Sequence, residues 1–396
     1  MLDKKYKILL VHNFYQKPGG EDTVFYNEKK LLEDNGHKVI TYTRDNKEIL
    51  NMNFFKKLLL PLAVIFNYKT YFDIKKIIKD NDIDVVHVHN TLSLISPSVF
   101  YAAISMKVPV VQTLHNFRMQ CPNGLFYRDG HICEDCVSRG LGCALKHKCY
   151  RNSFLQTVVI VLMIKIHRLT GVYKKINFIC LTRFNKKKLL SINNDKIIVD
   201  SGKISVKSNF VFNVEKKDKG QSEFLGNRHY YLYIGRYDEV KGIDIALKAF
   251  SRMPNKELHV IGSGDDKYIK EYCKYQNIRF IGQLSNDKVL NELSHCNALI
   301  YPTRWYEGQP VSIIEAFMNK CPVITSDIGN VNEMIEDGRT GLHFAANSVE
   351  SLIERINYYE RLSINEFKCC SYKEYMNKYS DDISYCRIIS IYNALV

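Results

Sequence analysis

Apolar residues in the first half of the chain gather in short runs, separated by polar, glycine-containing or helix-spaced segments. Runs of strand length lie at 7–14, 38–43, 84–89, 109–115 and 176–182. Between the first two runs, apolar positions recur at helical spacing and stop at Asn35-Gly36, where glycine is a favoured helix terminator. Strands that alternate with helices predict a parallel, doubly wound sheet.

The second half repeats this alternation after a polar stretch at 214–229, which we interpret as a linker. Its strand-like runs lie at 230–235, 257–262, 278–282, 298–303 and 322–327. We therefore predict an α/β protein of two Rossmann-like domains whose parallel sheets face each other across a cleft. The expected boundaries are 1–213 for the first domain, 214–375 for the second, and 376–396 for a terminal helix that packs back on the first.

The composition is that of an ordinary globular protein, with 46% hydrophobic and 25% charged residues, which excludes a disordered or fibrous chain. The 56 basic and 42 acidic residues give a net charge of +14. This charge favours anionic partners, but it does not choose between nucleic acid, phosphorylated ligands and a membrane surface.

No segment has the features of a secretion signal, and the longest apolar runs, 58–66 and 158–164, are far shorter than the roughly 18 to 20 residues that span a bilayer. We therefore expect a cytoplasmic protein, either free or peripheral to a membrane. Because that compartment keeps thiols reduced, the 12 cysteines are not expected to form disulfides.

Ligands of doubly wound sheets bind at the carboxyl ends of the strands, so the loops there are the places to look for chemistry. The run at 230–235 is followed by Arg236 and then by Lys241-Gly242 at the start of a helical pattern. Two cations beside a helix amino terminus indicate an anion site, because the terminal N–H groups and the helix dipole already favour negative charge. The alternative is a pair of solvated cations.

Two glutamates follow the strand-like run at 298–303. Pro310 suits the first turn of a helix, which places Glu315 about one and a half turns along it and leaves Glu307 on the preceding loop. Each carboxylate could accept hydrogen bonds from ligand hydroxyls. The alternative is a capping carboxylate and an exposed helix acid.

Together these motifs resemble the carboxyl-terminal domain of the retaining glycosyltransferases of family four, which have the GT-B fold. The motifs that carry this resemblance are Arg236, Lys241, Glu307, Glu315 and the E-x-I-x-D-G-x-T-G run at 333–341. In the first half, the Gly19-Gly20 loop and the Thr113-Leu114-His115 segment follow strands in the family's order. The resemblance therefore covers nearly the whole chain.

The resemblance implies transfer of a sugar from a nucleotide diphosphate with retention of configuration, by front-face attack in which the leaving phosphate helps to take the acceptor proton. It implies that Arg236 and Lys241 hold the diphosphate in place of a divalent metal, so no catalytic cofactor is expected. Glu315 would accept the ribose hydroxyls, and His115 would lie near the reacting sugar. The residues expected to bind the donor are Gly19, Gly20, Arg236, Lys241, Glu307, Gly308, Gln309, Pro310, Val311 and Glu315. The expected catalytic residues are His115, Glu307, Arg236 and Lys241.

The histidines have a plainer interpretation as well. Without the resemblance, His115 would be a buried, hydrogen-bonded histidine of the core. We keep that interpretation for His87 and His89, which lie in the run at 84–89.

Five cysteines crowd into the segment after His115, where we expect an insertion at about 116–152. Four of them, with one C-x-x-C pair, supply thiolates for a tetrahedral structural zinc site: Cys121, Cys133, Cys136 and Cys149. The pattern also resembles a subset of the family, in which Cys149 rather than Cys143 fills the last position. The alternative is reduced cysteines that pack as small hydrophobic side chains.

Two stretches combine apolar runs with cations and lack acidic residues. One extends from 49 to 72 and carries Lys56, Lys57 and Lys69, and the other extends from 136 to 194 with twelve Lys and Arg. Both lie in the half that binds the acceptor in the family, so we expect docking to an anionic membrane surface. The alternative is an ordinary core face with solvated cations around it.

These expectations describe a glycosyltransferase that acts on a lipid-linked saccharide of a bacterial capsule, exopolysaccharide or lipopolysaccharide, at the inner face of the cell membrane. A soluble acceptor is the alternative within this enzyme class. A basic, zinc-containing nucleic-acid-binding protein would explain the charge and the cysteines but not the charged residues at strand ends, so no nucleic acid is expected as a partner. A nicotinamide dehydrogenase is disfavoured, because Lys267 replaces the third glycine of a G-x-G-x-x-G motif that begins at Gly262.

Overall fold

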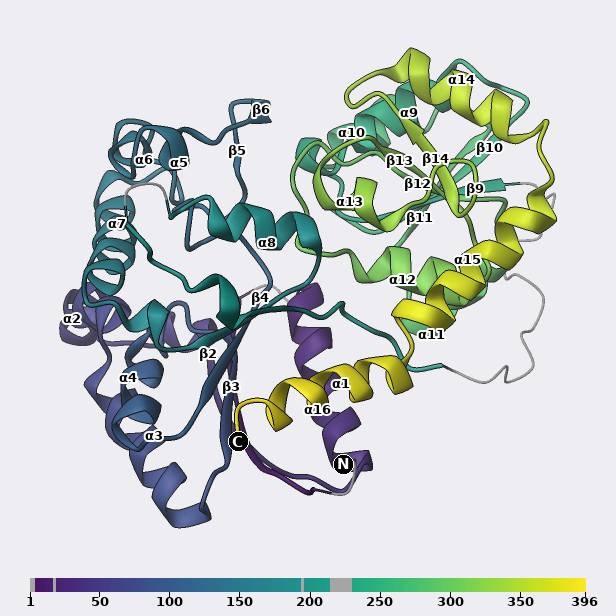
Figure 1. The fold of residues 1–396 in the computed structure, drawn as a ribbon. Coiled ribbons are helices and arrows are strands. Elements are labelled where there is room, and N and C mark those ends of the chain that lie inside the picture. Colours follow the sequence, from purple (N-terminus) through teal and green to yellow (C-terminus); the bar gives the residue numbers. More distant parts are fainter. Residues whose placement is uncertain (1–3, 17–18, 194–195, 214–229) are drawn as a thin grey trace. The chain divides into compact units, whose positions relative to one another are not determined.

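A computed structural model describes residues 4–16, 19–193, 196–213 and 230–396, which form two compact units (Figure 1). The first unit holds the residues up to Asn209 together with the terminal segment Ser384–Val396. The second runs from Phe210 to Ile383 and also includes Asp129–Ile132. The division thus falls before the expected position at 213, and the expected linker at 214–229 lies outside the described residues.

The sheet of the first unit has six parallel strands in the order β2-β1-β3-β4-β7-β8. These strands are β1 Lys7–Phe14, β2 Lys38–Asp45, β3 Val85–Asn90, β4 Val110–Leu114, β7 Asn177–Cys180 and β8 Ile204–Val206. The main helices are α1 Gly20–Asp34, α2 Phe54–Ile65, α3 Tyr68–Asn81, α4 Ser98–Ser105, α7 Phe154–Leu169, α8 Arg183–Leu190 and α16 Asp381–Asn393. The cysteine-rich segment adds β5 Tyr127–Arg128, β6 His131–Ile132, α5 Asp135–Ser138 and α6 Gly142–Lys146.

The sheet of the second unit is also parallel, in the order β11-β10-β9-β12-β13-β14. Its strands are β9 Tyr230–Ile234, β10 Glu257–Ile261, β11 Ile278–Gly282, β12 Leu299–Tyr301, β13 Val323–Ser326 and β14 Gly341–Phe344. Its helices are α9 Ile243–Ser251, α10 Lys267–Tyr272, α11 Asn286–His295, α12 Val311–Met318, α13 Gly329–Met334, α14 Val349–Tyr359 and α15 Ile364–Lys378.

All ten strand-like runs of the sequence are strands, and the predicted parallel α/β architecture is confirmed. The reason is burial on both faces: every residue of β12, for example, is buried, and its sequence Leu-Ile-Tyr is a short apolar run. The sequence analysis missed the edge strands β8 and β14 and the short hairpin of β5 and β6. These elements are only two to four residues long and carry too few positions for a periodic signal.

The carboxyl-terminal helix α16 completes the core of the first unit. Its Ile388, Ile389 and Tyr392 pack with Tyr6 and Ile8 around β1. The Tyr6 hydroxyl also bonds the side chain of Asn393. The last helix of the chain is therefore part of the amino-terminal core, and Figure 1 shows it beside α1.

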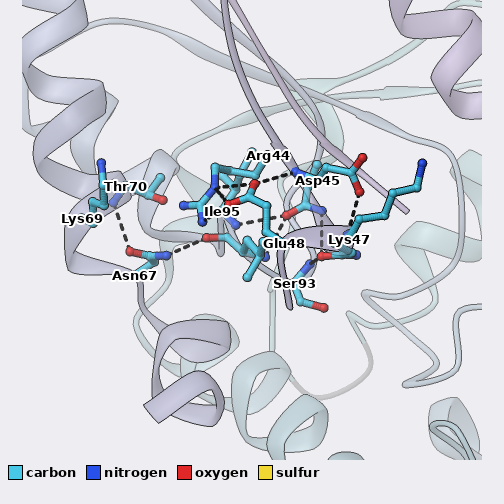
Figure 2. A network of polar contacts seen from close by, with 12 residues as sticks. Arg44, Asp45, Lys47, Glu48, Asn67, Lys69, Thr70, Ser93 and Ile95 are labelled. Carbon is cyan, nitrogen blue, oxygen red and sulfur yellow. Dashed lines mark hydrogen bonds and ion pairs between the residues drawn. The ribbon is translucent and has the colours of Figure 1, made fainter. Parts of the chain in front are cut away.

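A polar network holds the carboxyl end of β2, the loop after β3 and the start of α3, as Figure 2 shows. Arg44 pairs with Glu48 at 2.7 Å, and Asp45 accepts a hydrogen bond from Lys47 N at 2.7 Å. Asn67 joins the start of α3 to the loop after β3, because its Oδ1 accepts a hydrogen bond from Thr70 N at 3.1 Å while its Nδ2 donates to Leu94 O at 2.6 Å. The segment that leads from β3 to α4 is thus held from two sides.

The helix α2 covers the core only with one narrow side. Its Val64 packs against α7, whereas Phe54, Phe55, Leu58, Leu59 and Leu62 are between 58% and 74% exposed. Within the described part of the chain, no helix combines the length and the hydrophobicity that crossing a bilayer requires. The exposed side of α2 is therefore an apolar surface on a short helix.

Candidate functional site

The turn between β9 and α9 carries the two predicted cations. Asp238 closes this turn by accepting a hydrogen bond from Lys241 N at 2.9 Å, and its Oδ2 lies 3.1 Å from Arg236 Nη2. Gly242 has a φ of +69°, and a Cβ there would lie 1.8 Å from Pro302 O, so only glycine fits. The Arg236 side chain remains 63% exposed at the carboxyl end of β9, where an anion can reach it.

Lys241 forms an ion pair with Glu307, which lies on the loop after β12. Their Nζ and Oε1 atoms are 2.8 Å apart, and Oε1 also accepts hydrogen bonds from Tyr301 OH at 3.0 Å and Thr303 Oγ1 at 3.2 Å. Burial opposes ionisation of Glu307, but the Lys241 ammonium outweighs it and lowers the pKa of this carboxyl below its usual value. Both groups are therefore charged, and each holds the other at the strand ends.

Pro310 is the N-cap of α12, and Glu315 lies inside this helix, as the sequence predicted. Burial raises the pKa of the Glu315 carboxyl to about 7. Gly308 is fixed in the preceding loop, because its carbonyl oxygen accepts a hydrogen bond from Asn330 Nδ2 at 2.5 Å. Gln309 is buried, so this loop presents backbone more than side chains.

Arg304 is a residue of this site that the sequence analysis missed. It donates to both carboxylate oxygens of Asp244, at 2.7 and 2.8 Å, and to the carbonyl oxygen of Glu239 at 2.9 Å. This fork joins the start of α9 to the loop after β12, and so holds Lys241 and Glu307 in register. Nothing in the sequence marks the pair, because the two residues lie 60 positions apart.

Gly262 and Gly264, which could suggest a dinucleotide motif, have a packing role. A Cβ on Gly262 would lie 1.9 Å from Gly235 O, and one on Gly264 would lie 2.5 Å from Tyr237 O. These glycines let the turn after β9 cross the loop after β10. The backbone that comes close to Gly262 and Gly264 is thus that of the turn after β9, and the two glycines do not indicate a dinucleotide.

In the first unit, the Gly19-Gly20 turn opens α1 at the carboxyl end of β1. Asp22 accepts a hydrogen bond from Gly19 N at 2.9 Å, and its other carboxylate oxygen lies 2.7 Å from Nε2 of the buried His12. A Cβ on Gly19 would meet no atom within 4 Å. Among the described residues, no packing contact therefore demands glycine at this position.

His115 follows β4 and stacks on His89, with ring centroids 5.2 Å apart. His115 Nε2 lies 3.0 Å from His89 Nδ1. A cavity of about 50 Å³ adjoins the two rings and is lined also by Asn90 and Asn116. His87 and His89 were predicted to be buried histidines of the core, and the burial of both is confirmed. His87 also makes hydrogen bonds through both of its ring nitrogens.

A second residue that the sequence analysis missed is Glu21. Burial, helped by the neighbouring Asp22, raises the pKa of the Glu21 carboxyl to about 8 although Arg118 acts in the opposite direction. The Arg118 guanidinium also lies over the Tyr150 ring at 5.6 Å and donates to Pro122 O at 3.1 Å. Arg118 therefore connects the first βα turn to the cysteine-rich segment.

The cysteine cluster differs from the predicted set. Burial raises the pKa of the Cys136 thiol to about 12, and the neighbouring thiols that add to this effect are Cys121, Cys149 and Cys143. Cys133 is not among them. The spacing put Cys133 in the predicted set, and the resemblance gave the last position to Cys149 rather than Cys143. Proximity to Cys136 favours Cys143 as well as Cys149, and Cys143 lies on α6 beside α5.

Two groups of potential metal ligands, among the residues the structure describes, have ligand atoms within 4.8 Å of one another. They are Glu28 with His87 and His89, and His12 with Glu21 and Asp22. The cysteines form no group that close. The thiols thus converge without being drawn together to the contact distances of a bound zinc ion.

Both units have a parallel six-stranded sheet with polar and charged residues at the carboxyl ends of its strands, which is the fold of the GT-B class. The similarity to solved structures agrees with this fold. Alr3699/HepE from Anabaena in complex with UDP superposes with a TM-score of 0.68 at 14% identity, over 98% of this chain and 100% of that one.

Sequence comparison places a glycosyltransferase domain in each half of the chain. Residues 18–131 match the Glycosyltransferase Family 4 domain, and residues 214–379 match Glycosyl transferases group 1. The O-antigen biosynthesis glycosyltransferase WbnH of Escherichia coli is 24% identical over 273 residues, which span 68% of this chain and 66% of that protein. An uncharacterized 42.6 kDa protein in the cps region of Klebsiella pneumoniae is 23% identical over 316 residues, 78% of this chain and 76% of that one.

Proposed function

We propose that the protein is a retaining glycosyltransferase whose donor is a nucleotide-diphosphate sugar. The observation that carries this proposal is the ion pair of Lys241 and Glu307 beside the exposed Arg236, at the carboxyl ends of β9 and β12. UDP is present in the Anabaena protein that shares this fold, which supports a nucleotide donor. A nucleic-acid-binding protein has no use for an ionised carboxylate fixed among these cations.

Arg236 and Lys241 would stabilise the charge that develops on the leaving diphosphate, the work a divalent metal does in other transferases. Glu307 would orient Lys241 and hold the donor sugar, with the backbone from Gly308 to Val311. Glu315 would accept the ribose hydroxyls. His115 in the first unit would contact the reacting sugar, which is attacked on the face that the diphosphate leaves.

A calorimetric titration tests the donor class directly. Binding of UDP or GDP with no response to NAD or to a short oligonucleotide is the expected result. A screen of nucleotide sugars, with mass spectrometry of the products and NMR of the new anomeric centre, then identifies the sugar and tests retention. A product with inverted anomeric configuration would overturn the assignment as a retaining enzyme. The assignment of a nucleotide-diphosphate sugar as the donor would still hold.

For the acceptor we propose a lipid-linked saccharide of a bacterial surface polysaccharide, bound at the inner face of the cell membrane. The relatives from O-antigen synthesis and from a cps region support the pathway. The structure supplies a surface that fits a bilayer. On α2, five large apolar side chains are exposed beside Lys56 and Lys57, and no acidic residue lies in this helix.

An aromatic hollow lies where this helix ends. It has a volume of about 430 Å³, and the residues lining it include Phe66, Tyr68, Tyr71, Phe72, Tyr101 and Lys175. Tyr68 and Phe72 are more than 60% exposed, so a chain could enter from the surface. We propose that the hollow takes part of the apolar chain of the acceptor lipid, with Lys175 facing its anionic end.

Co-sedimentation with anionic liposomes tests this surface. Binding should weaken as salt rises, because screening shortens the reach of each charge. Changing Leu58 and Leu62 to Ser should release the protein, while Tyr358→Ser, an exposed side chain on α14 outside both acid-free stretches, is the control. A wild type that ignores anionic liposomes at low salt would indicate a soluble acceptor. Lys188 is unsuitable for this test, since it pairs with Glu134.

We also propose a structural zinc ion in the cysteine-rich segment, held by Cys121, Cys136, Cys149 and either Cys143 or Cys133. Metal analysis of single Cys→Ser variants decides the fourth ligand. Proximity predicts that Cys143→Ser loses the metal and Cys133→Ser keeps it. Wild-type protein that is free of zinc after purification without chelator would return the cluster to packed thiols.

A further inference from the structure

A chain of buried polar groups runs from His115 into the core of the first unit. His115 Nε2 lies 3.0 Å from His89 Nδ1, and His89 Nε2 lies 3.6 Å from Glu28 Oε1. The other oxygen of Glu28 accepts a hydrogen bond from Lys207 Nζ at 2.8 Å. His89, Glu28 and Lys207 are each at most 3% exposed. Burying an ion pair costs free energy, because both charges lose their hydration and only their attraction and hydrogen bonds offset this loss. We therefore asked what this buried pair does to the groups around it.

The group of Glu28, His87 and His89 is unsuited to a metal ion. His87 Nδ1 lies 2.8 Å from Tyr392 OH, and His87 Nε2 lies 2.8 Å from Thr113 Oγ1, so neither nitrogen is free. The Lys207 ammonium in contact with Glu28 would also repel a cation. The network is therefore a set of hydrogen-bonding groups, and its properties depend on which ring nitrogen of each histidine carries the proton.

The charges in this network are determined by its own members. Burial opposes ionisation of Glu28, but Lys207 and His87 hold the pKa of its carboxyl well below the usual range. Burial lowers the pKa of His89 to about 4 and that of His115 well below its ordinary value. Both imidazoles are then neutral near pH 7, and each carries a single N–H whose position its neighbours select.

The Glu28 carboxylate selects the tautomer of His89. Among the described residues, neither His89 Nε2 nor Glu28 Oε1 has a hydrogen bond, although Oε1 also lies 2.9 Å from His87 Nδ1. The two unbonded atoms are buried 3.6 Å apart, so the most favourable state of His89 has an Nε2–H directed at the Glu28 carboxylate. His89 Nδ1 then carries the lone pair and must accept the proton of His115 Nε2. The remaining nitrogen of His115, Nδ1, is left unprotonated, and no described residue bonds to it.

We propose that Glu28 is a positioning residue which, through His89, keeps His115 in the Nε2–H form and so presents Nδ1 as a hydrogen-bond acceptor to a hydroxyl of the bound sugar. The proposal rests on the role proposed above for His115. The remaining titratable groups beside the chain are His87 and Tyr392 next to Glu28, and His12, which is bound to Asp22. None of them places a negative charge closer to His89 than Glu28 does.

The test is Glu28→Gln, which removes the charge and keeps the shape. Long-range ¹H–¹⁵N NMR of the imidazoles reports the tautomer directly. In the wild type, His115 should have a protonated Nε2 and a bare Nδ1, and the variant should show a mixture. We expect kcat to fall by about ten- to a hundredfold with an unchanged KM for the nucleotide sugar, as for other carboxylates that orient a histidine.

Glu28→Gln leaves the Lys207 ammonium buried without its carboxylate, so the variant could fail to fold. The double variant Glu28→Gln with Lys207→Met removes both charges and keeps the test decisive. Glu33→Gln, on the exposed side of the same helix, is the matched control. A folded double variant with the wild-type tautomer of His115 overturns the proposal. If His115→Ala keeps full activity, the role of His115 fails, and the NMR result still decides what Glu28 does.

Discussion

The two units present their ligand-facing residues in opposite ways. In the second unit, Lys241 and Glu307 are charged groups in contact, and Arg236 extends from the same strand ends into solvent. In the first unit, the ring at the strand end is the neutral His115, and the charges of Glu28 and Lys207 lie behind it in the core. The second unit thus has a charged group exposed at its strand ends, whereas the first has its charged pair buried beneath the ring of His115.

The proposed function accounts for this difference. A diphosphate carries negative charge, which fixed cations stabilise directly. A sugar hydroxyl is neutral and needs a donor or acceptor of defined direction, so a neutral imidazole in one tautomer suits it better. In the second unit, activity should therefore be most sensitive to the loss of a charged group at the strand ends. In the first unit, it should be most sensitive to the loss of a charged group buried behind His115.

The largest effect should come from the presented charges. Lys241→Ala and Glu307→Ala should each lower kcat by at least about a hundredfold, because a preorganised contact to the reacting groups is lost. Steady-state kinetics measures this, with Lys270→Ala on an exposed helix of the same unit as control. Activity should also survive EDTA. Near-normal turnover of the Lys241 variant would contradict its assignment to the leaving group.

A smaller effect is expected where the charge only supports the site. Asp244→Asn should weaken the fork with Arg304 and lower kcat by about tenfold, because Lys241 and Glu307 would no longer be held in register. Stability should fall by about 1 to 3 kcal/mol in chemical denaturation, since hydrogen bonds to charged groups contribute that much. A change in stability without any change in kcat would show that the contact between Arg304 and Asp244 supports folding and does not affect catalysis.

Nucleotide affinity should depend on pH through Glu315. Its carboxyl has a pKa of about 7 in the free protein and must be ionised to accept the ribose hydroxyls. Affinity for a nucleotide sugar should therefore be constant above about pH 7 and fall by up to about tenfold for each pH unit below it. Calorimetry in buffers of different ionisation enthalpy should detect the released proton. Glu315→Gln should bind weakly at every pH, without this dependence.

The last prediction concerns the stability of the first unit and not its activity. Because the pKa of Glu21 is raised to about 8 in the folded protein, its contribution to stability is fully present below its ordinary value of 4.5 and is lost as pH rises towards 8. The free energy of unfolding should decline across this window by up to about 1.4 kcal/mol per pH unit. Urea titrations of wild type and Glu21→Gln should differ in this slope. Parallel curves would show that Glu21 is ionised after all.

Much of the second unit could be predicted from the sequence, because its motifs are local. Arg236, Lys241 and Gly242 share one strand-to-helix turn, and Glu307 and Glu315 lie on one loop and the helix after it. Local geometry then places each side chain at the strand ends. The contact between Lys241 and Glu307 could not be predicted from local sequence, because the two residues lie on the separate turns after β9 and β12.

Less of the first unit could be predicted. Its networks join residues from β3, α1, the segment after β8 and the carboxyl-terminal helix, which no window of sequence brings together. Glu28 looks like an ordinary helix acid, and only its burial distinguishes it. In the cysteine-rich segment, spacing pointed to Cys133, but the packing of α5 and α6 brings Cys143 towards Cys136.

The amino-acid sequence by itself determined the parallel α/β class, all the central strands and the turn that carries the cations, because hydrophobic periodicity and glycine placement act over a few residues. Only the tertiary structure decided which side chains share a proton or a charge. Those pairings depend on distances of a few ångströms between elements that are remote in the chain. They also depend on the balance between burial and neighbouring charges, which ionises Glu28 beside Lys207 and raises the pKa of Glu315.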